Sequence, residues 1–284
     1  MGMAVSLEES FAECRRITAK ARSSFRFAFR LLPPHKADAM NALYAMARLT
    51  DDLADGSGTV GSKRQALSQW KSDLRLAVAG AHTHAIHPAL CDTMQRFGLP
   101  MDDFDQLISG CLQDMAPVPF GTYAELQQYC YRVSCVIGLN CVRIWGVQPG
   151  ATWDEVHPPI LEAGYACQMT NILRDLAEDS RARRVYIPQE ELAKFDIAPP
   201  DWAKSSRFNE FLHWQLDRVA GHYRKAEALV PLLSAEGRAI YSLMMRAYRE
   251  LAERLRKAGP ALLRRKVRLS AWQKLKLLWA TRIH

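Results

Sequence analysis

The sequence predicts an all-α protein that forms a single domain over residues 1–284. Apolar side chains recur at the three-to-four-residue period of an amphipathic helix along most of the chain. No stretch longer than four or five residues has the character of a strand, and no repeat, low-complexity segment or linker divides the chain. The chain is therefore expected to fold as a helical bundle.

The helices expected in the first half are bounded by proline and glycine. Prolines 33 and 34 should end the first helix, and glycines 56, 58 and 61 should end the second. In order, the expected helices span residues 6–31, 35–55, 62–79 and 89–116, the last with a break at 98–100.

The second half continues the helical pattern. Thr122 and Glu125 have the spacing of a capping box, which predicts a helix that continues to about Trp145. Gly138 inside this helix costs about 1 kcal/mol relative to Ala, which indicates a close approach or a kink; a small residue at a helix crossing explains it equally well. After a loop at 146–159, further helices are expected from Ile160 to before Pro188 and over 205–233 and 235–258.

Composition indicates an ordinary globular protein, with 49% hydrophobic and 24% charged residues. The seven cysteines form no CxxC pair and no Cys/His cluster of zinc spacing, and their odd number without a signal peptide indicates a reducing interior. No apolar run approaches the roughly 20 residues that a spanning helix needs. We expect a cytoplasmic protein.

Three histidines, His82, His84 and His87, fall in the loop between residues 80 and 88. They could be read as metal ligands. Their Gly, Thr and Pro neighbours favour the alternative that they lie in a solvated connection.

The stretch that points to function is the helix around residues 171–179. Residues four apart share a helix face, so Asn171, Asp175 and Asp179 project as one column. Oxygen ligands of this kind suit Mg²⁺, which divides its coordination shell among carboxylates, waters and substrate phosphates. A single aspartate pair at this spacing is more often a solvated acidic face.

A second copy of the pattern overturns that simpler interpretation. Asp51 and Asp55 again stand four apart, with Asp52 beside them and Arg48 one turn earlier. Two aspartate clusters with neighbouring arginines suggest two walls of one metal–diphosphate site. A ferritin-like di-iron centre is the alternative, but neither aspartate motif contains the Glu-x-x-His spacing of that class.

In these residues the chain resembles the squalene/phytoene synthase family of head-to-head prenyl synthases. The resemblance covers about residues 10–270, and it rests on motifs in a fixed order. These are Ser24–Phe25, Phe29–Pro33, Ala42–Ala45, Arg48–Asp55, Tyr129–Val133 with Gly138, Gln168–Asp179 and Arg184–Pro188.

The resemblance implies the isoprenoid synthase-type bundle with a central cavity. It places the metal at Asp51, Asp52, Asp55, Asn171, Asp175 and Asp179. It assigns diphosphate or pocket positions to Tyr44, Arg48, Gln168, Arg174, Tyr186 and Tyr248. Ser24 is expected at the substrate, and Phe25, Phe29 and Tyr131 are expected to line the prenyl tunnel.

The implied reaction joins two identical allylic diphosphates through a cyclopropyl intermediate, with Mg²⁺ or alternatively Mn²⁺ as cofactor. We favour farnesyl diphosphate, giving presqualene diphosphate or a C30 product, as in bacterial hopanoid pathways. Phytoene synthesis from geranylgeranyl diphosphate is the alternative, and NADPH use stays open. The chain departs from the family pattern at Arg132, which stands where squalene-forming eukaryotic members have Tyr, and at Pro117–Phe120, which lacks an Arg-Tyr pair.

The rival class is a catalytically silent binding relative on the same bundle, against which the intact aspartates of both clusters argue. A nucleic-acid protein rests only on the basic C-terminal end. Ten of the Lys and Arg residues behind the net charge of +8 lie from Arg254 onward, where there is no acidic residue. Leu and Trp interleave with these cations over residues 262–284, which suits either a last bundle helix or docking on the anionic inner face of a membrane.

Overall fold

The computed structural model describes residues 5–21, 26–115 and 117–268. This part of the chain is helical and contains no strand, with one isolated β-bridge between Val147 and Leu233. It divides into two compact units, each assembled from segments far apart in the sequence. The first comprises Met1–Ala116, Leu139–Gln148 and Leu233–Ile240, and the second comprises Pro117–Gly138, Pro149–Leu232 and Tyr241–His284. The all-α prediction is confirmed, and the single domain stays a prediction.

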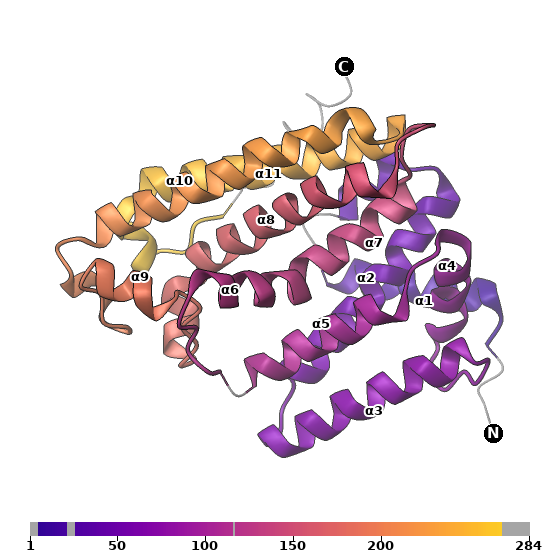
Figure 1. Ribbon diagram of the computed structural model, residues 1–284. Coiled ribbons are helices and arrows are strands. Elements are labelled where there is room, and N and C mark those ends of the chain that lie inside the picture. The colour runs from indigo at the N-terminus through magenta and orange to yellow at the C-terminus, as the bar shows by residue number, and fades with distance from the viewer. Residues whose placement is uncertain (1–4, 22–25, 116, 269–284) are drawn as a thin grey trace. The chain divides into compact units, whose positions relative to one another are not determined.

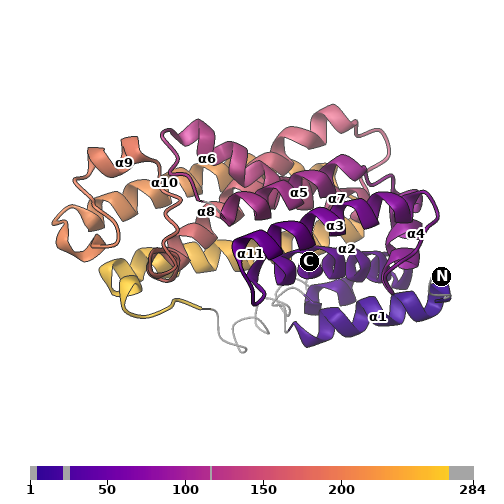
Figure 2. The same ribbon diagram turned by 90° about the horizontal axis from the view of Figure 1, so that it is seen from below.

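The first unit is built around the long helix α2. Its elements are α1 (Leu7–Lys20), η1 (Arg26–Leu31), α2 (Pro34–Asp55), α3 (Val60–Val78), α4 (His87–Phe97) and α5 (Met101–Asp114). Helix α2 packs against α1, α3, α4 and α5, and Figure 2 shows α1 alongside it. Its sequence explains this central place, because Ala39, Ala42, Leu43, Ala45 and Met46 are all buried.

The second unit is organised by α8 (Trp153–Arg181), which packs along α10 (Phe208–Ala226), as Figure 1 shows. Its other elements are α6 (Tyr123–Cys130), η2 (Tyr131–Cys135), the start of α7 (Val136–Trp145), α9 (Gln189–Lys194), η3 (Trp202–Lys204), η4 (Glu227–Leu232), most of α11 (Ala235–Ala258) and η5 (Gly259–Leu263). The element η2 is a π turn that joins α6 directly to α7.

Glycine lets the π turn approach α8 closely. A Cβ atom added at Gly164 would lie 2.5 Å from Cys135 Sγ, and one added at Gly138 would lie 3.3 Å from Ile160 Cγ2. Ser134 Oγ donates a hydrogen bond to Gly164 O at 3.0 Å across the same contact. The prediction that Gly138 marks a close approach is confirmed.

Several predicted boundaries were wrong. The first helix ends at Lys20 and not at residue 31. Helix α8 begins at Trp153, because Thr152 and Glu155 form a capping box, and it accommodates Pro158 and Pro159 in its second turn. The predicted capping box at Thr122 is only half formed, since the Glu125 carboxylate accepts from Gly121 N at 2.7 Å.

The solvated position expected for the loop histidines is wrong for His87. This residue begins α4 and is fully buried, and its Nδ1 accepts from the backbone N–H groups of Thr83 and His84 at 3.2 and 3.3 Å. Burial lowers the pKa of His87 to about 4, so the ring stays neutral. All seven cysteines are free, and no helix of the described residues is both long and apolar enough to cross a bilayer.

Candidate functional site

The first aspartate cluster lies in the last two turns of α2, in the first unit. Arg48 Nη2 donates to Asp52 Oδ1 at 2.5 Å. Asp51 keeps solvent access, but protein surrounds its carboxylate closely, and this desolvation together with the charge of Asp55 raises the pKa of Asp51 to about 6. Arg48 offsets only part of that effect. The cluster therefore carries negative charge that a divalent cation would relieve.

Helix α5 adds two groups that the sequence did not single out. Cys111 Sγ is 3.9 Å from Asp51 Oδ1, and the charge of Asp114 also raises the pKa of Asp51. The helical period predicts α5 but does not say which helix packs against it. The contacts of Cys111 and Asp114 with Asp51 could therefore not be predicted from the sequence.

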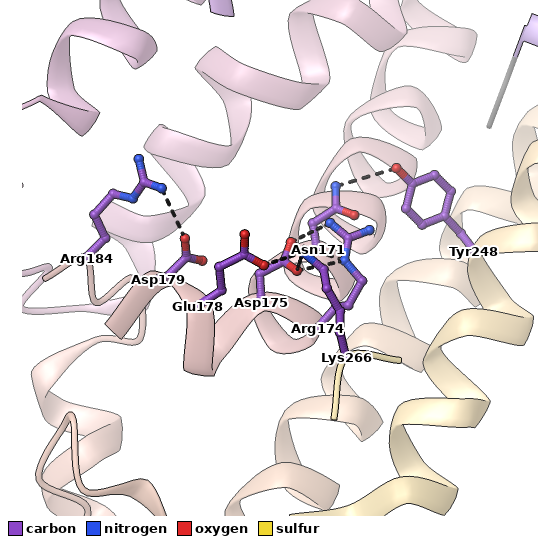
Figure 3. Close-up of polar contacts among 8 residues, drawn as sticks. All are labelled: Asn171, Arg174, Asp175, Glu178, Asp179, Arg184, Tyr248 and Lys266. Carbon is purple, nitrogen blue, oxygen red and sulfur yellow. Dashed lines mark hydrogen bonds and ion pairs between the residues drawn. The ribbon is translucent and has the colours of Figure 1, made fainter. Parts of the chain in front are cut away.

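The second cluster lies on α8, in the second unit, where Asn171, Asp175 and Asp179 form the predicted column (Figure 3). Asn171 Nδ2 donates to the Tyr248 hydroxyl at 3.5 Å. Asp179 Oδ1 pairs with Arg184 Nη2 at 3.5 Å. Asn171 and Asp179 thus each have a partner that can also hydrogen-bond to an anionic ligand.

Asp175 has cationic contacts from two side chains, Arg174 and Lys266. Arg174 Nε lies 3.0 and 3.1 Å from its two oxygens, and Lys266 Nζ lies 3.0 Å from Oδ1. Burial alone would raise the pKa of Asp175, but Arg174 and then Lys266 outweigh it, and the pKa is lowered. The ammonium group of Lys266 acts here as a stand-in cation, so the donor set fits a metal ion.

Two tyrosines of the expected substrate site are held by their surroundings. Burial raises the pKa of Tyr248, so its phenol stays protonated and can donate a hydrogen bond. The Tyr186 ring stacks on Tyr129 with ring centroids 5.1 Å apart, and it also stacks on Phe120 at 6.5 Å. Phe120 therefore supports Tyr186 at one of the two places where the chain departs from the family pattern.

The other predicted residues are divided between the units. Phe29 is buried on η1 and Tyr44 is half-buried on α2, both in the first unit. Gln168 lies on α8 one turn before Asn171, and Tyr131 begins the π turn, both in the second unit. Ser24 and Phe25 lie outside the described residues.

The structure places one aspartate cluster in each unit, and each holds its members on one helix. Among the described residues, no three His, Cys, Asp or Glu side chains are grouped tightly enough to form a complete metal-ligand set by themselves. The one Glu-x-x-His spacing in the chain, Glu210 to His213, gives no di-iron ligand, because Glu210 binds Arg207 through both oxygens.

An all-α protein with crowded aspartates beside arginine and tyrosine has side chains that could bind an anionic diphosphate through divalent cations. The chain matches the squalene/phytoene synthase family model over residues 18–273 and belongs to that family, whose members are prenyltransferases that condense prenyl diphosphates head to head.

Relatives and solved structures agree with this membership. The chain is 33% identical to a 15-cis-phytoene synthase of Synechococcus elongatus over 95% of its length and 91% of the relative. It is 30% identical to a phytoene synthase of Arthrospira platensis with the same coverage. The fold superposes on a dehydrosqualene synthase with a TM-score of 0.87 and 25% identity, over 98% of this chain and 96% of that one. A squalene synthase of Alicyclobacillus acidocaldarius shares the fold, with a TM-score of 0.81 and 24% identity over 89% and 95%.

Proposed function

We propose that the protein is a Mg²⁺-dependent prenyltransferase that joins two identical allylic prenyl diphosphates head to head. The observation that carries the proposal is the pair of aspartate clusters, each with cationic side chains that can bind phosphate oxygens. In the proposed reaction, the C–O bond of one substrate breaks and diphosphate leaves with the electron pair. The resulting cation alkylates the double bond of the second substrate, and loss of a proton closes the cyclopropane ring.

Asp51, Asp52 and Asp55, with Asn171, Asp175 and Asp179, would hold the metal. When bound, Mg²⁺ neutralises diphosphate oxygens and so favours departure of the leaving group. Arg48 and Arg174 would each give planar N–H donors to diphosphate oxygens, a geometry that suits phosphate. The protonated phenol of Tyr248 would donate a further hydrogen bond, and Gln168 would orient the substrate.

The remaining site residues would protect the cationic intermediate. Phe29, Tyr131 and Tyr186 carry aromatic rings, which would help to exclude water from a reactive carbocation. Tyr186 is suited to this because it is fixed by stacking on Tyr129. Water that reached the cation would quench it to an alcohol, so the fraction of alcohol product measures this function.

For chain length we propose farnesyl diphosphate, with presqualene diphosphate or a C30 hydrocarbon as the product. A C20 substrate is the second candidate, and the phytoene synthases at 30–33% identity favour it. Incubation with each diphosphate, with and without NADPH, followed by mass analysis of the products, separates the two. A C40 product alone would exclude the C15 proposal, and a C30 product that requires NADPH would identify a reductive enzyme.

We also propose peripheral, salt-sensitive association with the anionic inner face of a membrane through residues 262–284. Arg264, Arg265, Lys266 and Arg268 are the described cations of this segment, and residues 269–284 lie outside the described part of the chain. A product with little solubility in water gives the enzyme a reason to work at a bilayer.

A further inference from the structure

Lys266 is a cation at the second aspartate cluster that comes from neither α8 nor the loop directly after it. It follows η5, more than eighty residues further along the chain, and its backbone is not helical. Its ammonium group lies 3.0 Å from Asp175 Oδ1 and also pairs with Glu178 (Figure 3). This contact ties the start of the basic C-terminal segment to the helix that carries the proposed metal ligands.

The contact occupies a carboxylate group that would hold the proposed metal. Arg174 already donates to both oxygens of Asp175, from Nε at 3.0 and 3.1 Å and from Nη2 to Oδ2. Lys266 adds a second positive charge at Oδ1. With Lys266 in place, the charge of Asp175 is balanced before any divalent ion arrives.

A divalent cation and an ammonium group compete for the same oxygen, because both need its electron pairs and they repel each other at short range. Arg174 is the residue next to Asp175 on α8 and therefore stays beside it. Lys266 can leave Asp175 and turn toward solvent. The Glu178 side chain beside it is 58% exposed, and the Lys266 side chain already reaches solvent.

We propose that Lys266 competes with the divalent cation for Asp175, so that metal loading displaces Lys266 and releases residues 264–268 from α8. This inference rests on the proposed metal site. We call this contact of Lys266 the latch: in the metal-free protein Asp175 and Glu178 hold Lys266, and in the loaded protein Lys266 is free to bind an anionic surface.

The affinity for Mn²⁺, measured from the electron paramagnetic resonance signal of free Mn²⁺ without substrate, tests the competition. We expect Lys266→Met to bind Mn²⁺ about threefold to tenfold more tightly than the wild type, the range set by losing two partly exposed ion pairs. Arg265→Met is the matched control, because it removes a neighbouring positive charge that makes no ion pair to α8 within the described structure. An equal gain in both variants would mean that charge alone is responsible and would overturn the latch.

Displacement itself is measured by the reactivity of the lysine. Acetylation of Lys266 by an N-hydroxysuccinimide ester, mapped by mass spectrometry and normalised to the exposed Lys257, should become several-fold faster when Mn²⁺ is added to the wild type. Asp175→Asn should make Lys266 reactive without metal. Unchanged reactivity on metal binding would overturn the proposal.

The same measurements separate the latch from the proposed function. If wild type and Lys266→Met bind Mn²⁺ equally well, the latch is wrong and the metal site stands. If neither binds Mn²⁺ even with inorganic diphosphate present, the metal site is wrong, and the latch falls with it.

Discussion

Asp52 and Asp175 carry the same side chain in different electrostatic settings. Asp52 pairs with one arginine at the end of α2, whereas Asp175 on α8 has both an arginine and a lysine. We expect Asp52→Ala and Asp175→Ala each to lower turnover by about 100-fold or more, since each removes a charge that the proposed site needs in the transition state. Initial rates of diphosphate release give the measurement, with far-ultraviolet circular dichroism as the check on folding. Asp201→Ala, which alters an aspartate whose side chain pairs with the surface residue Lys204, is the control. Turnover that survives in both site variants would place the chemistry elsewhere.

His87 gives the stability of the protein a specific dependence on pH. Its pKa falls from 6.5 to about 4 on folding, first because of burial and then because His84 and His82 lie near. Between these values the unfolded state binds the proton more strongly, so the free energy of unfolding should fall as pH falls from about 6.5 to 4. The slope from this one group is at most about 1.4 kcal/mol per pH unit.

His87→Asn isolates this contribution, because the amide oxygen replaces the Nδ1 acceptor and does not titrate. Denaturant unfolding at a series of pH values should give a flatter profile for the variant. Asp51 and Asp103, whose pKa values burial raises to about 6, contribute the opposite slope equally to both proteins. Parallel profiles would show that the pKa of His87 does not change on folding.

At the scale of elements, the contact between the π turn and α8 leaves no room for another carbon atom. In Gly164→Ala the new Cβ would lie 2.5 Å from Cys135 Sγ and 2.8 Å from Cys135 Cα, so the helices must separate. We expect a loss of about 1–3 kcal/mol in unfolding free energy. Gly221→Ala on α10 is the matched control, because its Cβ would meet only Arg224 Nη2 at 3.8 Å, and there we expect a gain of up to about 1 kcal/mol. If the denaturant midpoints of the two variants shifted by the same amount, the close contact at Gly164 would not determine stability.

Most helices were predictable because Gly and Pro mark their ends. The ends of α2 and α3 and the break at Gly98 follow from such residues, and Gly98 has a left-handed backbone conformation with φ of 63°. The same rule failed at α8, where it predicts a loop through Pro158 and Pro159. A proline disturbs the first turns of a helix less than its middle, and the capping box at Thr152 was the stronger signal. The short helix α9 was missed because six residues are too few to show a period.

At the scale of the whole molecule, the sequence predicted those parts of the site that are local. The column of Asn171, Asp175 and Asp179 depends only on helical geometry and was predictable from spacing. The contact of Lys266 with Asp175 and that of Cys111 with Asp51 join residues 91 and 60 positions apart. Such pairs depend on how helices pack, which no local pattern encodes. Lys266 was read only as one of many basic residues near the chain end.

The membrane proposal also belongs to this scale, because it concerns the summed charge of a segment. Each Lys or Arg close to an anionic bilayer contributes about 1 kcal/mol, and salt screens the attraction. We expect the protein to sediment with anionic liposomes at low salt, to be released from them at high salt, and not to bind neutral liposomes. Replacing Arg264, Arg265 and Arg268 by Gln should weaken the binding measurably. Protein that stays in the supernatant with anionic liposomes at low salt would limit the segment to a structural role.

The π turn at Tyr131–Cys135 amounts to one residue more than a regular helix would hold over the same length. Each residue of a helix turns the chain by about 100°, so this insertion sets the faces of α6 and α7 independently of each other. Tyr129 can therefore stack on Tyr186 while Gly138 faces Ile160. Deleting a single residue here would leave a continuous helix but rotate one of these two faces away from its partner. In evolution, the gain or loss of one codon at this turn would rotate α7 relative to α6 and change which side chains each helix presents to its neighbours.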